Sequence, residues 1–283
     1  MATVTGDIDA VARETYSSVI KHAYQSGHLL SGAYYFENST DSKLHKFRLM
    51  GKSIAKVKTG TSQMVDSSDI DHTLIECPMG VLYDKKLDDY EINKPTVNFD
   101  PASQYVMALG YSMGRGKDQL LLDALDNAVV PAANTIAVGT TNLTLAKIRA
   151  ASKVMNAGAV PNGDRIFLIN AAGLSSLQSE ATFTSIDYNQ NKPLTNGQIY
   201  QYMGFKFIVI DDRVEGGLPL TGTTATCFAY DKRALGMAMN YDITSEVTRQ
   251  NLLSSWLIEA RLLAGAVAID PAGIVKVNIK IDA

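Results

Sequence analysis

The sequence DPASQYVMALGYSMGRGKDQLLLDALDNA, residues 100–128, decides the fold. It begins with Asp100, a good helix N-cap, and Pro101, which stands at the first helical position, where its missing N–H has no partner to lose. We predict one uninterrupted helix that ends by Pro131. At 1.5 Å per residue it would be roughly 40 Å long. A domain of this size does not need so long a helix to cover its core, so we expect something outside the chain to pack on it.

The predicted helix carries one apolar stripe that is interrupted by Gly110, Gly114 and Gly116. Each interior glycine destabilises a helix by up to about 1 kcal/mol relative to alanine. Three glycines so close together indicate either a close approach by a neighbouring backbone or a bend. The stripe itself consists of Val106, Leu109, Met113, Leu120, Leu121, Ala124 and Ala128.

Two polar extended segments, Phe47–Lys58 and Thr73–Glu91, precede the helix. The first is basic on one face and the second is acidic, so the two limbs of a hairpin could hold each other by cross-strand pairs. Equally, the hairpin could pair with a neighbouring subunit. We expect inter-subunit contacts from Arg48, Lys52, Lys56, Lys58, Asp84 and Asp88 on this extended loop, and from Arg115 and Asp118 on the helix. The last two are three residues apart and could instead form a local pair on the helix surface.

Composition and charge exclude several classes of protein. Only 19% of the 283 residues are charged, below the roughly 25% of an average domain, as extensive subunit interfaces would explain. A net charge of -3 argues against condensing nucleic acid, so any DNA contact should be weak and non-specific. The acidic start is no secretory signal, and the run Leu262–Ile269 is too short to span a membrane. We therefore expect a soluble intracellular protein with Cys77 and Cys227 reduced and buried.

The remaining pattern mixes helices and strands without a regular βαβ period, which favours the α+β class. We predict helices over residues 7–30, 143–157 and 174–179. The first, at the N-terminus, should form an arm rather than a core element. Strands are predicted at 165–169, 205–210, 226–230, 243–249 and 275–281.

This order of elements resembles the major capsid proteins of tailed bacteriophages, which share the Hong Kong 97 fold. The likeness rests on GKSIAKVKTG at 51–60, LGYSMGRGKDQLLLDAL at 109–125, RIFLINAAG at 165–173 and NGQIYQYMGFKF at 196–207. The pattern is most similar to short-tailed phages. The resemblance implies an N-terminal arm (1–40), an extended loop (41–98), a peripheral domain with a spine helix (99–163), an axial domain (164–258) and a peripheral C-terminal strand (259–283).

The resemblance also implies a function without chemistry. Such subunits form hexamers and pentamers of an icosahedral shell around double-stranded DNA, usually with the help of a scaffold protein and a portal. They assemble in the host cytoplasm and end in the virion capsid, with no membrane and no cofactor. Some members crosslink through a loop lysine, and Lys58 stands in this loop, but no motif assigns such a bond. We expect non-covalent locking.

The alternative is a small-molecule-binding or hydrolytic α/β enzyme, which a pocket with convergent polar groups would favour. Two motif fragments give it little support. Gly51-Lys52-Ser53 lacks the earlier glycine of a phosphate-binding loop, and Gly114-Arg115-Gly116 lies inside a helix. The four histidines have no metal-site spacing and are expected at the surface or an interface.

Overall fold

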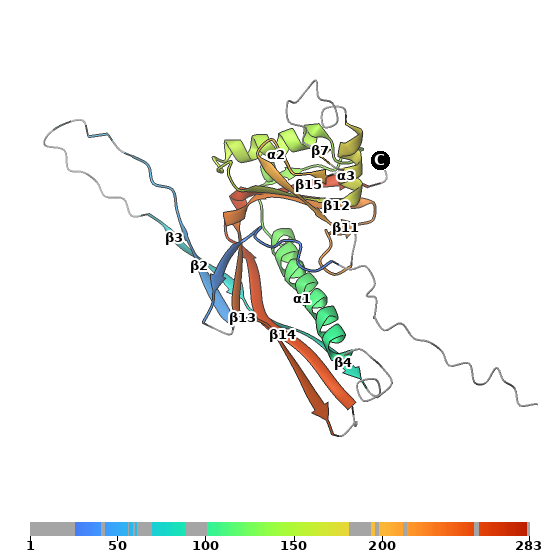
Figure 1. The fold of residues 1–283 in the computed structure, drawn as a ribbon. Coiled ribbons are helices and arrows are strands. Elements are labelled where there is room, and N and C mark those ends of the chain that lie inside the picture. Colours follow the sequence, from blue (N-terminus) through green and yellow to red (C-terminus); the bar gives the residue numbers. More distant parts are fainter. Residues whose placement is uncertain are drawn as a thin grey trace, which may run out of the picture.

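The computed structural model describes residues 26–40, 43–55, 57–58, 60, 70–88, 101–180, 194–195, 198–211, 214–251 and 255–281. It shows a layered body above a long ribbon of strands, with one helix running beside the ribbon and a hairpin projecting from it (Figure 1). The arrangement is α+β, as predicted.

The ribbon is a four-stranded sheet in the order β1-β13-β14-β4. Helix α1 (Pro101–Asp126) packs on one face of this sheet, where Leu109 and Met113 share a core with Ile258 and Leu262 of the inner strand β14. This confirms the predicted long helix, and residues 106–126 are described with their side chains. The strands are β1 (Tyr35–Asn38), β13 (Leu235–Gln250), β14 (Ser255–Ala268) and β4 (Gly80–Asp88).

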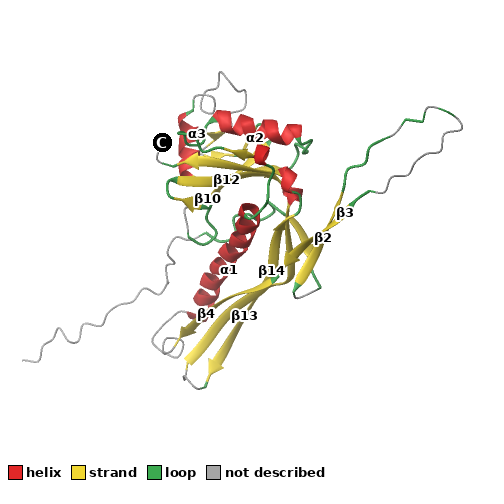
Figure 2. Ribbon diagram, turned by 180° about the vertical axis from the view of Figure 1, so that it is seen from behind, coloured by secondary structure: helices red, strands yellow, loops and turns green. Residues whose placement is uncertain are grey.

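The layered body is built on a seven-stranded sheet that is covered on both faces (Figure 2). On one face, α2 (Leu145–Ala157) and α3 (Ala171–Ser179) cover the sheet. Leu121 and Leu125 of α1 pack against the other face of the sheet. The strands follow the order β5 (Thr135–Ile136), β15 (Ile274–Lys280), β12 (Thr224–Asp231), β6 (Arg165–Asn170), β10 (Phe205–Ile210) and β9 (Gln201–Tyr202), with β11 (Leu220–Thr221) beside β12.

Burial on both faces explains the sequence of β6, RIFLIN, in which every residue is buried. Phe167 and Ile169 face the layer of α2, whereas Ile166 and Leu168 face α1. A strand with one wet side would have alternated polar and apolar residues. The last turns of α1 thus contact the core of the layered body, while its earlier turns cover the ribbon.

The projecting hairpin pairs β2 (Leu44–Met50) with β3 (His72–Pro78) in antiparallel register. Phe47 and Cys77 anchor it, because both are buried against Ala238 and Ile269 at the top of the ribbon. The other short elements are β7 (Leu194–Thr195), β8 (Gln198–Ile199) and three 3-10 turns, η2 (Ala132–Asn134), η3 (Lys232–Ala234) and η4 (Pro271–Gly273).

The domain boundaries that the resemblance implied stay a prediction, and the packing of the described elements adds detail to them. Val275, Val277 and Ile279 of the C-terminal strand β15 lie with α2 in one core of the layered body. Ile274 of the same strand lies in the core that contains α1, and the Lys276 ammonium group donates to the Asp126 carbonyl of α1. Strand β13 lies under α1 in the ribbon. The boundary placed between residues 258 and 259 falls inside β14, a strand that was not predicted.

The N-terminal prediction also needs correction. Of the helix expected over 7–30, residues 7–25 lie outside the described part, and residues 26–30 are not helical. Leu30 and Ala33 are buried in the main core, and β1 pairs in parallel with β13. The chain from residue 26 to 38 is therefore part of the body and not a separate arm.

The acidic limb is divided between two sheets. It was predicted as one segment over 73–91, but it breaks at Met79 into β3 and β4, and β4 pairs with β14. Asp84 lies opposite Ala260 and Asp88 opposite Trp256. Of the two alternatives that the sequence left open, cross-strand pairing of these two carboxylates with the basic limb is therefore not formed.

The contact between hairpin and ribbon yields a first testable prediction. A Cβ at Gly265 would lie 2.3 Å from the Pro78 carbonyl oxygen and 3.0 Å from the Cys77 sulfur. We expect Gly265→Ala to lower the free energy of unfolding by about 1–3 kcal/mol, because backbone must move. Chemical denaturation measures this change.

The matched control is Gly110→Ala in α1, where an added Cβ meets nothing within 4 Å. Helix propensity should make this variant more stable by up to about 1 kcal/mol. Equal stability of Gly265→Ala and the wild type would contradict the close packing of the hairpin on β14.

Candidate inter-subunit surfaces

The described part of the projecting hairpin exposes large apolar side chains together with cations. Ile54 is 82% exposed and Val57 84%, and Met50 and Leu74 are also exposed. Exposed apolar side chains gathered on a projecting element are typical of interaction surfaces. A two-stranded sheet is also only marginally stable alone in water, so its extended form would benefit from a partner.

The basic side chains of the hairpin have different surroundings. Arg48, Lys52 and Lys58 are exposed and form no ion pair with a described residue. Lys56 lies outside the described residues. Across the two strands, Lys46 and Glu76 form an ion pair at 3.0 Å. The structure thus leaves three of the four predicted basic residues available to a neighbour.

The two predicted carboxylates of the loop are placed elsewhere. Asp84 accepts a hydrogen bond from the Ser112 hydroxyl at 2.6 Å and lies 3.5 Å from the Lys86 ammonium group. It therefore ties β4 to α1 within one chain, and its expected inter-subunit role stays a prediction. Asp88 ends β4, and its side chain lies outside the described part.

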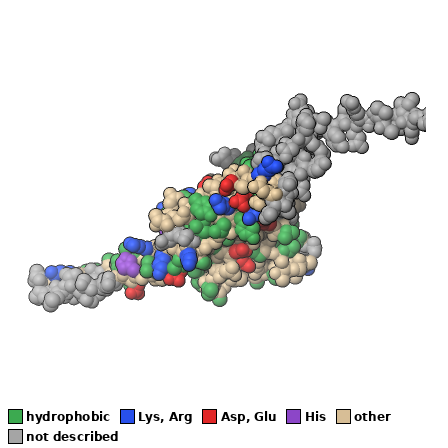
Figure 3. Space-filling view, turned by 90° about the horizontal axis from the view of Figure 1, so that it is seen from below, with side chains coloured by type: hydrophobic (Ala, Val, Ile, Leu, Met, Phe, Trp, Pro, Cys, Tyr) green, Lys and Arg blue, Asp and Glu red, His purple; other side chains and the backbone are tan. Residues whose placement is uncertain are grey.

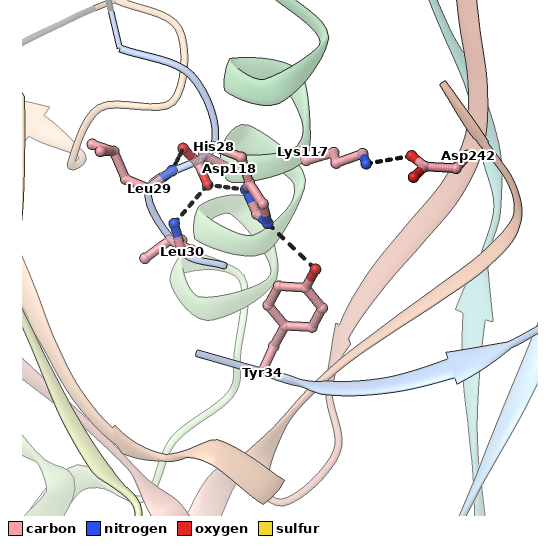
Figure 4. A network of polar contacts seen from close by, with 7 residues as sticks. All are labelled: His28, Leu29, Leu30, Tyr34, Lys117, Asp118 and Asp242. Carbon is pink, nitrogen blue, oxygen red and sulfur yellow. Dashed lines mark hydrogen bonds and ion pairs between the residues drawn. The ribbon is translucent and has the colours of Figure 1, made fainter. Parts of the chain in front are cut away.

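Asp118 is fully buried and organises the N-terminal segment (Figure 4). Its carboxylate accepts the backbone N–H groups of Leu29 at 2.9 Å and Leu30 at 3.1 Å, and lies 2.7 Å from His28 Nδ1. His28 Nε2 lies 3.3 Å from the Tyr34 hydroxyl. With the carboxylate ionised, Nδ1 is the donor. This position is a correction, because a buried carboxylate with partners in its own chain cannot contact another subunit.

Next to this network, Lys117 lies 2.7 Å from Asp242 of β13 (Figure 4). The hydrogen bond from Lys117 is the main reason why the pKa of the Asp242 carboxyl is lowered. Burial, followed by the charges of Asp118 and Asp242, raises the pKa of Tyr34. The middle of α1 is thus joined by polar contacts to both the N-terminal segment and the ribbon.

The glycines of α1 are explained by the same packing. A Cβ at Gly114 would lie 2.7 Å from the backbone nitrogen of His28, and one at Gly116 would lie 3.2 Å from Leu82. The close backbone approach inferred from the sequence is therefore real at Gly114. Its source is the chain's own N-terminal segment.

Arg115 points to the same region. Its guanidinium donates to the Ser26 carbonyl at 3.5 Å and lies 3.5 Å from the Glu215 carboxylate. Sequence reasoning missed this N-terminal strap, residues 26–34, as the partner of the helix. The sequence contains one signal for this contact. Gly114, a small residue that lets another backbone come close, stands one helical turn before Asp118, a side chain that can accept hydrogen bonds from that backbone.

The described residues do not support the enzyme alternative. No group of three or more His, Cys, Asp or Glu side chains among them could hold a metal. The thiols are buried, and burial raises the pKa of Cys77 to about 11 and of Cys227 to about 12, so neither is a nucleophile near neutral pH. In the part searched, no helix is both long and apolar enough to cross a membrane.

Known structures share this architecture. The head structure of Helicobacter pylori bacteriophage KHP40 aligns with a TM-score of 0.80 at 9% identity, covering 99% of this chain and 100% of that one. A Mycobacterium phage Che8 chain aligns at 0.72 and 16% identity, covering 94% and 97%. The capsid of Cyanophage P-SCSP1u gives 0.71 and 15%, covering 97% and 94%. Among curated proteins, none matches the sequence.

The long helix on a strand ribbon, the layered body and the projecting hairpin define a capsid subunit of the Hong Kong 97 type. The sequence matches the phage capsid protein family over residues 8–281. The chain belongs to this family. It is a major capsid protein, a structural component of the phage virion, and not an enzyme.

The buried carboxylate gives a second prediction. Asp118→Asn should lower the free energy of unfolding by about 2–3 kcal/mol, because the charge that strengthens its hydrogen bonds is lost. The control is Asp123→Asn on the same helix, where the substitution affects an exposed hydrogen bond from the Gln119 amide at 2.6 Å. The free energy of unfolding should fall by only a few tenths of a kcal/mol. If both variants unfold at the same denaturant concentration, the anchoring role of Asp118 is wrong.

The two thiols give a third prediction. Burial raises the pKa of both thiols above the value of about 8.5 that they have in the unfolded chain. The stability that comes from keeping the thiols neutral is therefore fully present below that unfolded pKa. It is lost as the pH rises through the folded pKa values of about 11 and about 12. At pH 8, iodoacetamide should leave the native protein unmodified and label both cysteines after unfolding. Mass spectrometry distinguishes these results. Rapid labelling of the native chain would contradict the burial of the thiols.

Proposed function

We propose that this capsid protein self-assembles into the hexamers and pentamers of an icosahedral shell that encloses double-stranded DNA. The observation that carries the proposal is the β2–β3 hairpin, which projects from the body and exposes apolar and basic side chains. A heterologous contact of this kind closes into a ring when the rotation between copies is right.

A receiving surface for a neighbour lies on the ribbon face opposite α1. Val81 is 53% exposed and Tyr83 68% on β4. Two exposed ion pairs flank them, Lys85 with Glu259 at 3.5 Å and Arg261 with Glu246 at 3.8 Å. Seen from below, exposed apolar and charged side chains lie side by side on the body (Figure 3).

The charged residues of the hairpin and of α1 fix how the neighbouring subunit is positioned. Arg48, Lys52 and Lys58, with Lys56 between them, and Arg115 on α1 contact the neighbouring subunit. Exposed ion pairs contribute only about 0–1 kcal/mol each, so they fix the register of the contact more than its affinity. Locking is non-covalent, since no motif assigns a crosslink to Lys58.

We extend the proposal to the remaining partners, by analogy with the fold that the chain resembles. A scaffold protein and a portal assist assembly in the host cytoplasm, and the phage is short-tailed. With a net charge of -3, the shell contacts packaged DNA weakly and without sequence preference.

The fourth prediction tests the hairpin. We expect a variant with residues 52–70 replaced by Asn-Gly to keep its fold, because the backbone contact from Gly51 N–H to the Asp71 carbonyl at 2.8 Å leaves the strand ends close enough for a two-residue turn. Sedimentation velocity and negative-stain electron microscopy should show shells, tubes or rings for the wild type and monomers for the variant. Both chains are studied alone and with a candidate scaffold protein.

The thermal melting temperature of the variant monomer is the control, and it should stay within a few degrees of that of the wild type. Shells formed by the shortened chain would sink the proposed role of the hairpin. A wild-type chain that stays monomeric under both conditions would sink self-assembly as a property of this chain.

A further inference from the structure

The turn between α2 and β6 contains an asparagine followed by a glycine, Asn162 and Gly163. Residues 161–164 are all exposed. Asparagine is one of the chemically labile residues of proteins, and a following glycine has no side chain to keep its own backbone nitrogen away from the asparagine amide. The same pair of residues occurs at 196–197, which lie outside the described part of the chain.

Both ends of this turn are fixed by hydrogen bonds. On one side, the buried Arg165 side chain donates to the carbonyl groups of residues 160 and 161. On the other side, the Asp164 carbonyl accepts the backbone N–H of Lys232 at 3.1 Å. The two residues in the middle of the turn therefore lie between fixed points.

The middle of the turn has no such bonds. Within the part of the chain that the structure describes, neither the Asn162 side-chain amide nor the Gly163 N–H has a hydrogen-bond partner. A Cβ at Gly163 would meet nothing within 4 Å, and one at Gly204 would lie 4.0 Å from Asn162 Oδ1. Both groups are therefore open to water and free to approach each other.

Two other asparagines of the described part are held in place. Asn134 is buried, and its side chain donates to the carbonyl groups of Ala272 and Ile274. Asn170 is also buried, and its Oδ1 accepts the Gly173 N–H at 2.8 Å. Because hydrogen bonds fix both amides, these two positions serve as internal references for the reactivity of Asn162.

We propose that Asn162 is a site of spontaneous deamidation. The Gly163 nitrogen loses its proton to water, and its electron pair forms a bond to the side-chain carbonyl carbon of Asn162. The bond from that carbon to Nδ2 breaks, and ammonia leaves with a proton taken from water. Water then hydrolyses one of the two carbon–nitrogen bonds of the resulting cyclic imide. The product is either aspartate or isoaspartate, in which the main chain runs through the side-chain carbon.

The reaction changes the charge of the turn. Each event adds one negative charge next to Asp164 and close to Lys206 and Lys232, which line one hollow together with Gly163. In the isoaspartate product, the main chain is also one carbon atom longer between the carbonyl groups that Arg165 holds and the start of β6. The subunit therefore acquires a second charge state as it ages.

The test incubates the full-length protein at mildly alkaline pH and follows its peptides by tandem mass spectrometry. Deamidation raises the mass of the peptide that contains Asn162 by about one dalton and yields two chromatographic forms, aspartyl and isoaspartyl. Asn162 should convert at least about tenfold faster than Asn134 or Asn170, because the buried amides react only after local opening. Fragment masses separate Asn162 from Asn196.

The matched control is Gly163→Ala. This variant should fold, because the added Cβ meets nothing within 4 Å and Gly163 is not among the described glycines with positive φ. Alanine restricts the backbone of residue 163 and should slow the reaction about tenfold. A wild-type Asn162 that reacts no faster than the two buried asparagines would overturn the proposal. So would an unchanged rate in Gly163→Ala, because the Gly163 nitrogen would then not be the attacking group.

Discussion

The rest of the structure depends on the burial of one carboxylate in the middle of α1. A buried charge must be matched by donors, and Asp118 finds them in the backbone of the strap at Leu29 and Leu30 and in the ring of His28. Because the strap is fixed on the helix, Leu30 and Ala33 enter the core and the chain is directed into β1. The sheet edge beside β13 is thereby closed.

Helix α1 then connects two layers that would otherwise be independent. Its earlier turns cover the ribbon through Leu109 and Met113, and its last turns cover the inner face of the seven-stranded sheet through Leu121 and Leu125. A helix with apolar contacts along its whole described length holds both parts in one orientation. This internal use explains much of its length, which from sequence alone suggested a partner outside the chain.

Local signals in the sequence predicted the elements better than their partners. Asp100 and Pro101 marked the start of α1, and the apolar run after Arg165 marked a buried strand. The strand that pairs with β4 could not be predicted from the sequence, because the charges of β4 are as complementary to the basic limb as they are to β14. Strand β14 was not predicted, because the run Leu262–Ile269 places apolar side chains on both faces of the sheet. The run therefore lacks the alternation of polar and apolar residues that indicates a strand. Among the expected contact residues, Asp118 was misjudged because a surface charge and a buried one look alike in a sequence.

The long hairpin of β13 and β14 has a further consequence. Its register shifts between Met239 and Tyr241 and again between Tyr241 and Thr244. Before this point Leu235 and Met237 are buried in the core, whereas residues 242–249 are exposed. A bulge bends and twists a strand locally, so the exposed length of β13 leaves the core in a direction that these two shifts fix, and every copy of the chain presents it at the same angle.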